Sequence, residues 1–298
     1  MIESLYEEVF CQTYGKDAEQ LTSTEAEAIQ SSVRMLRRGY RQPVCDSYYE
    51  REEARRAYMI AYYPYYIEPA RQLVASQVVA ALWAQREHYP VLRLAYFAAG
   101  PCPELYGTMQ ALHRTALYDR AEVTVLDAEP GWRPQQELTW RLCQREGLLN
   151  TEDICCSVAG CDNQRSCDSC TRAVECRHDL YDETDVYFMQ NYLSHVSPDE
   201  VQLMIGQLRE RLIRAKAGAV FVLIDLDYAV VQDVLQSVCT QLPSRVFVRS
   251  TNVWDDAPCA VKYPYPLPSG LKEQVFTGED GLVPRRWTKY YYAILQKR

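Results

Sequence analysis

The stretch that decides the fold is LAYFAAGPCPE, residues 94–104. It begins as an apolar run, turns at Gly100-Pro101, and continues as the start of a helix. A strand that turns directly into a helix lets backbone N–H groups approach a ligand closely, and the helix N-terminus favours negative charge there. The same pattern fits a strand–helix turn that binds nothing, so the stretch alone leaves both interpretations open.

From Val91 onward, short apolar runs alternate with helical stretches. This alternation is typical of βαβ units that build a parallel sheet, so the fold class is α/β. Strands are expected at 91–98, 122–127, 185–190, 219–225, 245–250 and 290–296. Helices are expected at 103–117, 134–146, 198–216 and 228–239.

The third strand of this sheet has two candidates, residues 153–158 and residues 173–177. The second is the favoured one, and it makes residues 151–176 a Cys-rich insertion. The last two strands are separated by a Pro-rich loop of roughly 35 residues, a length that is usually functional or disordered. Its aromatic residues predict a lid or a substrate wall: Trp254, Tyr263, Tyr265 and Trp287.

Residues 1–89 are expected to form a helical extension or cap, with the α/β domain at 90–298. Thr22 and Glu25 have capping-box spacing. The apolar positions of one helical face follow at Ile29, Val33 and Leu36. Further along lies a group of tyrosines flanked by arginines, namely Tyr58, Tyr62, Tyr63, Tyr65 and Tyr66. Rings packed over a ligand pocket are favoured here over stacking on nucleic-acid bases.

Charge and hydropathy limit the partners. The formal net charge is −8 over 298 residues, whereas nucleic-acid binders usually present a basic face. No run of 18 apolar residues is present, so no membrane span is expected. The first eight residues, MIESLYEE, are acidic where a targeting peptide is basic, which predicts a cytoplasmic protein.

Six of the twelve cysteines fall between residues 155 and 176. In a reducing compartment such a cluster indicates thiols or a metal before disulfides. Four of them have spacings that suit a structural zinc site: Cys156, Cys161, Cys167 and Cys170. An iron–sulfur cluster, free thiols and disulfides remain alternatives.

The region from Val91 to Arg298 resembles the class I S-adenosylmethionine-dependent methyltransferases, whose domain is a seven-stranded Rossmann-like sheet. In that family the first turn usually reads G-x-G-x-G after an acidic residue on the strand. Here Gly100 matches the middle glycine, Ala98 and Cys102 stand at the outer positions, and Tyr96 stands where the acidic residue is expected. The resemblance implies that this turn holds the amino-acid end of the cofactor, through Ala98, Ala99, Gly100, Pro101 and Cys102.

The resemblance also implies roles for residues further along the chain. Asp127, followed by Ala128, would accept the ribose hydroxyls at the end of the second strand, although a turn aspartate is the alternative. Asp179 would lie near the adenine amino group if the third strand is at 173–177. Asn191 would orient the cofactor or the substrate, and His195 would act as a general base.

The function that follows is S-adenosylmethionine-dependent methyl transfer to a small molecule or a protein side chain. A methyltransferase-like protein without activity, serving as a binding or assembly subunit, is an alternative supported by the missing strand carboxylate. An RNA methyltransferase that uses the cysteines to contact RNA is a second alternative, which the net charge disfavours. Cofactor binding separates the first two hypotheses.

Overall fold

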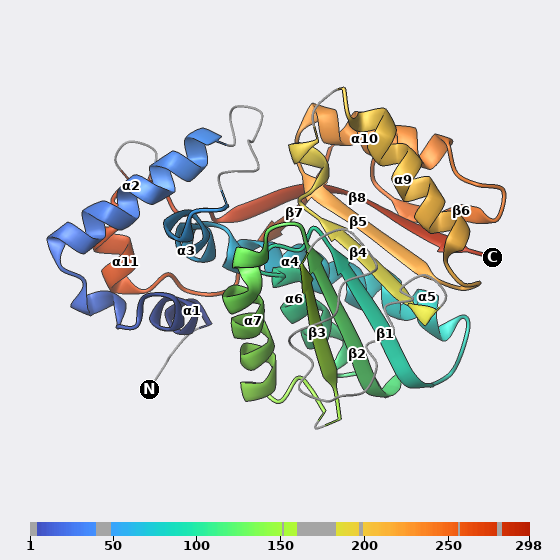
Figure 1. Cartoon of the computed structure of the whole chain (residues 1–298), viewed down its shortest axis with the longest axis horizontal. Helices are drawn as coiled ribbons and strands as arrows, with labels where there is room; N and C mark the ends of the chain where they lie inside the picture. The colour runs from blue at the N-terminus through green and yellow to red at the C-terminus, as the bar shows by residue number, and fades with distance from the viewer. Residues whose placement is uncertain are drawn as a thin grey trace.

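The computed structural model describes residues 5–39, 49–150, 152–159, 183–196, 199–255, 257–278 and 282–298. An eight-stranded sheet forms the centre of the molecule (Figure 1). Its strands are β1 (Tyr89–Phe97), β2 (Tyr118–Asp127), β3 (Ile154–Ala159), β4 (Val186–Gln190), β5 (Val220–Leu226), β6 (Val246–Thr251), β7 (Cys259–Lys262) and β8 (Trp287–Lys297).

The strand order is β3-β2-β1-β4-β5-β8-β6, and β7 pairs with β8 off this path. Strands β1 to β5 pair with one another in parallel, whereas β8 is antiparallel to β5, β6 and β7. The order changes direction between β1 and β4. In open parallel sheets such a switch point is where the crevice for a ligand forms, at the carboxyl ends of the strands.

The central strands are buried on both sides, and their residues alternate between two hydrophobic cores. Leu94 and Tyr96 belong to the first core, whereas Ala95 and Phe97 belong to the second. The first face is covered by α4 (Tyr63–Leu73), α5 (Val79–Trp83), α6 (Pro103–Leu112) and α7 (Arg133–Arg145). The second face is covered by α9 (Val201–Arg214) and α10 (Ala229–Thr240). A π-helical turn, η3 (Val74–Val78), joins α4 to α5.

The remaining helices gather at the left of Figure 1, beside the first face. They are α1 (Leu5–Tyr14), η1 (Ala18–Gln20), α2 (Ser23–Gly39), α3 (Glu52–Ala61) and α11 (Ser269–Gln274). The capping box of α2 is confirmed, since the Glu25 N–H donates to Thr22 Oγ1 at 3.3 Å and the Thr22 N–H donates to Glu25 Oε2 at 2.9 Å. The three apolar positions predicted for its buried face are all buried.

The third strand differs from the prediction. It is β3 at Ile154–Ala159, which pairs in parallel with β2, and not the favoured segment 173–177. The physical reason is register: placing Val158 beside Leu126 and Ala159 beside Asp127 extends the sheet from β2 without a gap. The insertion therefore cannot begin at residue 151, because residues 154–159 belong to the sheet. Residues 160–182, which include most of the predicted insertion, lie outside the described residues.

The long segment before the last strand also differs from the prediction of a simple lid. It contains β7, which gives the sheet its eighth strand, and α11. Helix α11 packs on η1: a Cβ on Gly270 would lie 2.5 Å from the Ala18 carbonyl oxygen. Tyr263 packs against the rings of Tyr6 and Tyr65. The segment thus ties the N-terminal helices to the sheet edge.

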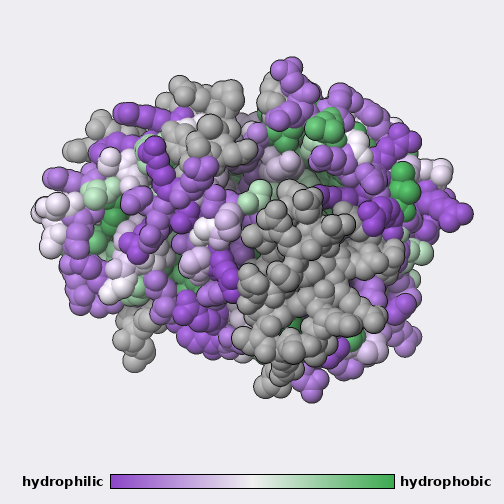
Figure 2. Space-filling view, viewed as in Figure 1, coloured by the Kyte–Doolittle hydropathy of each residue, from purple (hydrophilic) through white to green (hydrophobic). Residues whose placement is uncertain are grey.

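Most of the surface visible in Figure 2 is hydrophilic, with hydrophobic groups showing over α9 and α10. Leu203 and Ile213 on α9 are 64% and 54% exposed. Among the described residues, none of the helices is both long and apolar enough to cross a bilayer.

Candidate active site

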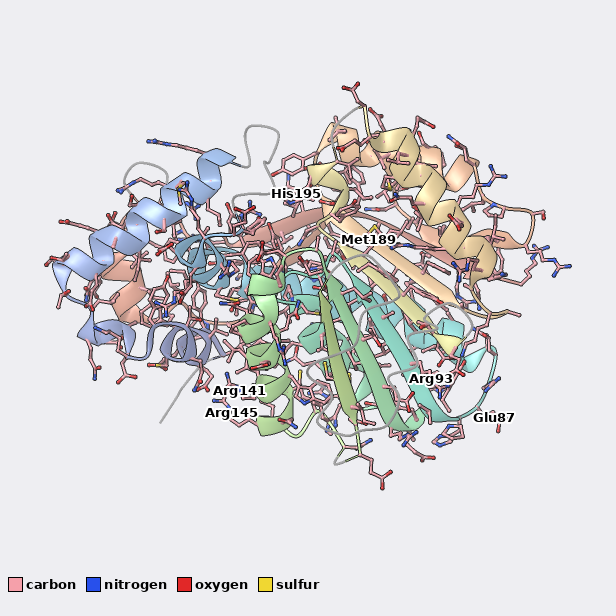
Figure 3. The ribbon with its side chains drawn as sticks, viewed as in Figure 1. Glu87, Arg93, Arg141, Arg145, Met189 and His195 are labelled. Atoms are coloured by element: carbon pink, nitrogen blue, oxygen red, sulfur yellow. The ribbon has the colours of Figure 1, made fainter. Side chains whose placement is uncertain are left out.

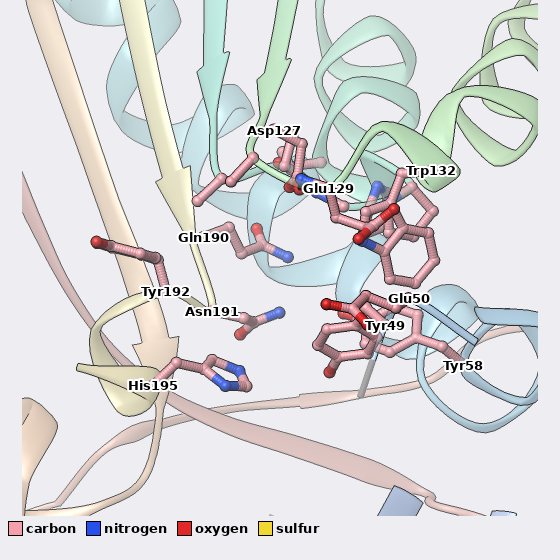
Figure 4. A pocket seen from close by; sticks show the side chains of 17 residues that line it. Tyr49, Glu50, Tyr58, Asp127, Glu129, Trp132, Gln190, Asn191, Tyr192 and His195 are labelled. Atoms are coloured by element: carbon pink, nitrogen blue, oxygen red, sulfur yellow. Dashed lines mark hydrogen bonds between the residues drawn. The ribbon is translucent and has the colours of Figure 1, made fainter. Parts of the chain in front are cut away.

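The carboxyl ends of β1, β2 and β4 meet at a cavity of about 330 Å³ (Figure 4). Figure 3 shows His195 and Met189 near the carboxyl ends of the strands, with Arg93 and Glu87 toward their opposite ends. The cavity therefore lies at the switch point between β1 and β4, where the strand order predicts a ligand.

The turn after β1 has an unusual backbone. The φ angles of Ala98, Gly100 and Cys102 are 50°, 51° and 58°, so every second residue is left-handed. Glycine adopts this conformation readily, whereas a side chain at Cβ makes it cost roughly 1–2 kcal/mol per residue. The backbone thus has the shape that a G-x-G-x-G sequence forms easily, although two of the three positions carry side chains.

Several hydrogen bonds hold this turn in place. The Gly100 N–H donates to Asp127 Oδ2 at 2.6 Å, and the Ala99 N–H donates to the Leu126 carbonyl at 3.2 Å. From α7, Gln136 Nε2 donates to the Gly100 carbonyl at 2.8 Å, and Thr139 Oγ1 donates to the Pro101 carbonyl at 2.7 Å. Strained backbone persists where its surroundings over-determine it, which is the case here.

Asp127 ends β2 and lines the cavity. Besides Gly100, it accepts the Glu129 N–H on Oδ1 at 2.9 Å. It therefore shapes the turn, as the alternative interpretation of this residue predicts. Each carboxylate oxygen has a second lone pair, so the same side chain can also accept from a ligand.

The loop after β4 supplies the other side of the cavity. Asn191 is left-handed, with φ 56°, and its N–H donates to the Ile224 carbonyl at 2.9 Å. The short helix η5 (Leu193–His195) follows and brings His195 to the cavity. Fully buried Asp225 accepts the Ser194 N–H at 3.0 Å, and burial raises the pKa of this carboxyl to about 6. Asp225 thereby anchors the loop that carries His195.

Among the described residues, the non-glycine residues with positive φ are Ala98, Cys102 and Asn191. All three belong to the two loops that border the cavity. Strained residues cluster at functional sites because other contacts must hold them there. Their shared location makes this cavity the candidate functional site.

No protein-family model matches the sequence, and no curated protein matches it either. Similar solved structures include a putative class I S-adenosylmethionine-dependent methyltransferase from Listeria monocytogenes, with 11% identity, 98% of this chain and 79% of that chain covered, and a TM-score of 0.46. Loganic acid methyltransferase has 12% identity, coverage of 81% and 96%, and a TM-score of 0.46. Precorrin-6y C5,15-methyltransferase from Geobacter metallireducens has 13% identity, coverage of 74% and 87%, and a TM-score of 0.37.

The strand order decides the fold. Five parallel strands in the order β3-β2-β1-β4-β5 are followed by antiparallel β8, inserted between β5 and β6. This chain has a Rossmann-like α/β fold that resembles the fold of the class I methyltransferases. The predicted Rossmann-like sheet is confirmed, with β7 as an additional strand.

The wall opposite the β4 loop is aromatic. Tyr49 and Tyr58 of this wall come from the N-terminal region, and Trp132 comes from the short helix η4 (Pro130–Trp132) after β2. The ring centroid of Trp132 lies 5.2 Å from that of Tyr49 and 5.4 Å from that of Tyr58. Figure 4 shows Asn191 and His195 across the cavity from these rings. The N-terminal tyrosine group therefore contributes a ring to the pocket, as predicted. The described lining includes no residue of the long segment before β8, so the lid or substrate wall expected there stays a prediction.

The lining is acidic. It contains the carboxyl groups of Glu50, Glu104, Asp127 and Glu129, and the described lining residues include no lysine or arginine. Carboxylates at close range favour a positively charged ligand. An aromatic wall adds to this preference, because ring faces attract cations.

The sequence analysis missed Glu104. It lies in the first turn of α6, is 1% exposed and lines the cavity. Its Oε1 atom has no hydrogen-bond partner in the part of the chain that the structure describes. A glutamate in the first turn of a helix is usually explained by its favourable interaction with the helix dipole, so its position alone does not indicate a role in a binding site. The signal that could have found it is the missing carboxylate at Tyr96, only eight positions away.

Most of the predicted cofactor residues lie together. The cavity is lined by Ala98, Ala99, Gly100, Pro101, Asp127, Ala128, Asn191 and His195. Cys102 is fully buried directly behind the turn. Asp179 lies outside the described residues, and its predicted place near adenine depended on a third strand at 173–177, which is not the third strand.

The predicted zinc ligands are not brought together in the described part of the chain. Cys156 is in β3, with its backbone beside Thr124 of β2. Cys161, Cys167 and Cys170 lie outside the described residues. Within the described residues, no group of three or more potential ligands could hold a metal ion.

Proposed function

We propose that this protein is an S-adenosylmethionine-dependent methyltransferase. The observation that carries the proposal is the turn at residues 98–102, which keeps the left-handed backbone at Ala98, Gly100 and Cys102 beside Asp127. A chain that needed only to join a strand to a helix would have no reason to keep this strain. A ligand that must approach the backbone closely gives that reason.

The residues present fit this cofactor. Glu104 and Gln190 line the cavity, and each has a buried Oε1 acceptor without a hydrogen-bond partner among the described residues. The Gln190 amide nitrogen donates to the Tyr66 carbonyl at 2.6 Å. This hydrogen bond fixes the orientation of the amide, so the Gln190 Oε1 atom needs a donor from another group. Unpartnered buried acceptors cost free energy, and a ligand with N–H or O–H donors removes that cost. The cofactor offers an ammonium group, ribose hydroxyls and an adenine amino group.

We assign the binding roles as follows. The turn at 98–102 holds the amino-acid end, with its backbone and the start of α6. Asp127, with Ala128 beside it, accepts the ribose hydroxyls while it keeps its two backbone partners. The acidic lining and the rings of Tyr49, Tyr58 and Trp132 favour the cationic form of the cofactor over neutral competitors.

When bound, the cofactor supplies a methyl group on a positively charged sulfur. The protein's contribution is to position the acceptor and exclude water, so no dedicated base is required. His195 is the residue placed to remove a proton from an oxygen or nitrogen acceptor. Asn191, in its left-handed conformation, orients the amide toward the cofactor or the acceptor.

The acceptor class that this site favours is a small molecule or a protein side chain. The described lining is acidic and has no lysine or arginine, which disfavours a phosphate backbone at the site and hence an RNA acceptor. The N-terminal region provides Tyr49, Glu50 and Tyr58 to the cavity, which supports its proposed role as a cap. Zinc bound by Cys156 and its neighbours stays a prediction that metal analysis of the purified protein tests.

Calorimetric titration with S-adenosylmethionine and with its demethylated product, S-adenosylhomocysteine, tests the proposal. We expect micromolar binding of both, and weaker binding after Asp127→Ala. An exposed carboxylate on α7 that pairs with Arg133 provides the control variant, Glu137→Gln, which should bind as the wild type does. A folded protein that binds neither ligand at millimolar concentration contradicts the proposal and favours the inactive binding or assembly role.

A further inference from the structure

Glu104 is a buried carboxyl group that forms no salt bridge with any described residue. It lies at the second position of α6, between Pro103 and Leu105, and is 1% exposed. Glu104 is one of the residues that line the cavity, and its buried Oε1 atom has no hydrogen-bond partner among the described residues. Burying an ionised carboxylate is costly unless a cation or several donors compensate it.

The described titratable groups that interact electrostatically with Glu104 come from five elements, and none of these groups is a cation. They are Tyr58 from α3, Tyr63 from α4, Tyr96 from β1, Cys102 from the turn and Asp127 from β2. Burial is the main cause that raises the pKa of Glu104 to about 8, and the nearby charge of Asp127 raises it further. The Cys102 thiol and the backbone N–H act in the opposite direction without compensating.

The strand position that would otherwise carry a carboxylate is closed. Tyr96 is fully buried, and its ring stacks on Phe188 with centroids 4.8 Å apart and planes 12° apart. Its side chain belongs to the first core, so β1 offers no acidic group to the cavity. The carboxyl that reaches the same cavity from the next element is Glu104, and the Gln190 oxygen is a second acceptor there.

We propose that Glu104 binds the ammonium group of the cofactor's amino-acid moiety, so that α6 supplies the carboxylate that strand β1 lacks. This inference rests on the proposed function and concerns the same cavity. The ammonium group is a cation with three donors, and it matches the two unpartnered acceptors, Glu104 Oε1 and Gln190 Oε1. Binding then replaces the uncompensated carboxyl with a paired one.

The test compares two ligands in wild type and in Glu104→Gln. S-adenosylhomocysteine carries the amino-acid moiety, whereas methylthioadenosine has the same adenosine and thioether without it. We expect Glu104→Gln to weaken S-adenosylhomocysteine binding by roughly ten- to a hundredfold, the range for a lost charged hydrogen bond. Methylthioadenosine should bind both proteins alike, and Glu137→Gln should bind both ligands as the wild type does.

A second measurement does not depend on the variant folding. Because the free carboxyl is largely protonated near neutral pH and the paired one is ionised, wild type should release about one proton on binding S-adenosylhomocysteine at pH 7. Titrations in two buffers that differ in ionisation enthalpy report this number. Binding of methylthioadenosine should release none, and Glu104→Gln should release none with either ligand.

The outcomes separate the two proposals. If wild type binds S-adenosylhomocysteine without proton release, or if Glu104→Gln weakens both ligands equally or neither, the role of Glu104 is overturned and the proposed function stands. If folded wild type binds neither ligand, the proposed function fails and the inference fails with it. Loss of S-adenosylhomocysteine affinity alone, together with proton release in wild type, supports the role of Glu104.

Discussion

The two faces of the sheet differ in how their polar groups are satisfied. On the first face, several buried atoms have no hydrogen-bond partner among the described residues, including Tyr96 Oη, Glu104 Oε1 and Gln190 Oε1. On the second face, α9 and α10 pack aliphatic side chains on the strands, and no described residue from 199 to 255 has such an atom. The first face carries most of the cavity lining at a cost in stability, whereas the second face packs without such atoms and reaches the cavity through Tyr192 in the loop after β4.

Alanine substitutions of two matched phenylalanines, one on each face of the sheet, should have the largest effects and test the difference between the two faces. Phe221 stacks on Tyr187 on the second face, with centroids 4.3 Å apart, and Phe188 stacks on Tyr96 on the first face. We expect Phe221→Ala to lower the free energy of unfolding by about 3–5 kcal/mol, because it empties a close-packed core. The affinity of the remaining folded protein for S-adenosylhomocysteine should not change.

Phe188→Ala should also destabilise the protein, and it should weaken S-adenosylhomocysteine binding as well, because Tyr96 faces Glu104. Denaturant unfolding and calorimetric titration measure the two effects. Equal loss of affinity in both variants would contradict the division between the faces.

The second prediction concerns the pH dependence of stability on the first face. Burial raises the pKa of Glu104 to about 8. At pH values between the ordinary pKa of glutamate and this raised pKa, the folded protein keeps a proton on Glu104 that the unfolded chain has released. The stability that comes from protonated Glu104 is therefore present at low pH and is lost as pH rises to about 8. Between about pH 5 and pH 8, the ligand-free wild type should lose about 3 kcal/mol more than Glu104→Gln loses.

Denaturant unfolding of both proteins across this pH range measures the difference. Parallel curves would show that Glu104 is ionised in the folded protein, with a cation or donor that compensates it. Saturating S-adenosylhomocysteine should make the wild-type curve flatter, because the ligand's ammonium group stabilises the ionised carboxylate.

The sequence predicts the sheet well where local patterns agree with tertiary contacts. The alternating apolar runs place β1, β2, β4, β5, β6 and β8, and the capping box places the start of α2. The favoured prediction for the third strand was wrong because the sequence offers two short candidates, and only pairing with β2 decides between them. Strand β7 is four residues long and is defined by its pairing with β8, which no local pattern shows.

The site was predictable in part for a related reason. Strand ends reveal themselves in sequence, so Gly100, Asp127 and Asn191 could be placed at one edge. The unpartnered state of Glu104 depends on Tyr58, Tyr63 and Tyr96, which arrive from three other elements. Sequence spacing alone does not show whether a buried carboxyl group has cations or hydrogen-bond donors beside it.

A smaller effect is expected at Asp127, where the first face meets the turn. Asp127→Asn keeps the size of the side chain but leaves one oxygen for the two backbone N–H groups of Gly100 and Glu129. We expect roughly tenfold weaker S-adenosylhomocysteine binding and a stability loss of about 1–2 kcal/mol, typical of one lost charged hydrogen bond. If affinity is unchanged while stability falls, Asp127 serves the turn alone and does not bind the ribose.

The smallest effect, and the one that most directly probes the strain in the turn, is expected from two neighbouring alanines. Ala98 is left-handed, with φ 50°, whereas Ala99 is not among the left-handed residues. Ala98→Gly removes a strain of roughly 1–2 kcal/mol and adds about 0.5–1 kcal/mol of unfolded-chain entropy, so stability should rise by about 0.5 kcal/mol. Ala99→Gly removes no strain and should lower stability by about the amount that glycine costs elsewhere. Denaturant unfolding gives both signs, and equal destabilisation by the two changes would mean that Ala98 is not strained. S-adenosylhomocysteine affinity should stay the same in Ala98→Gly, because a ligand that contacts the backbone senses its shape and not the side chain that the shape tolerates.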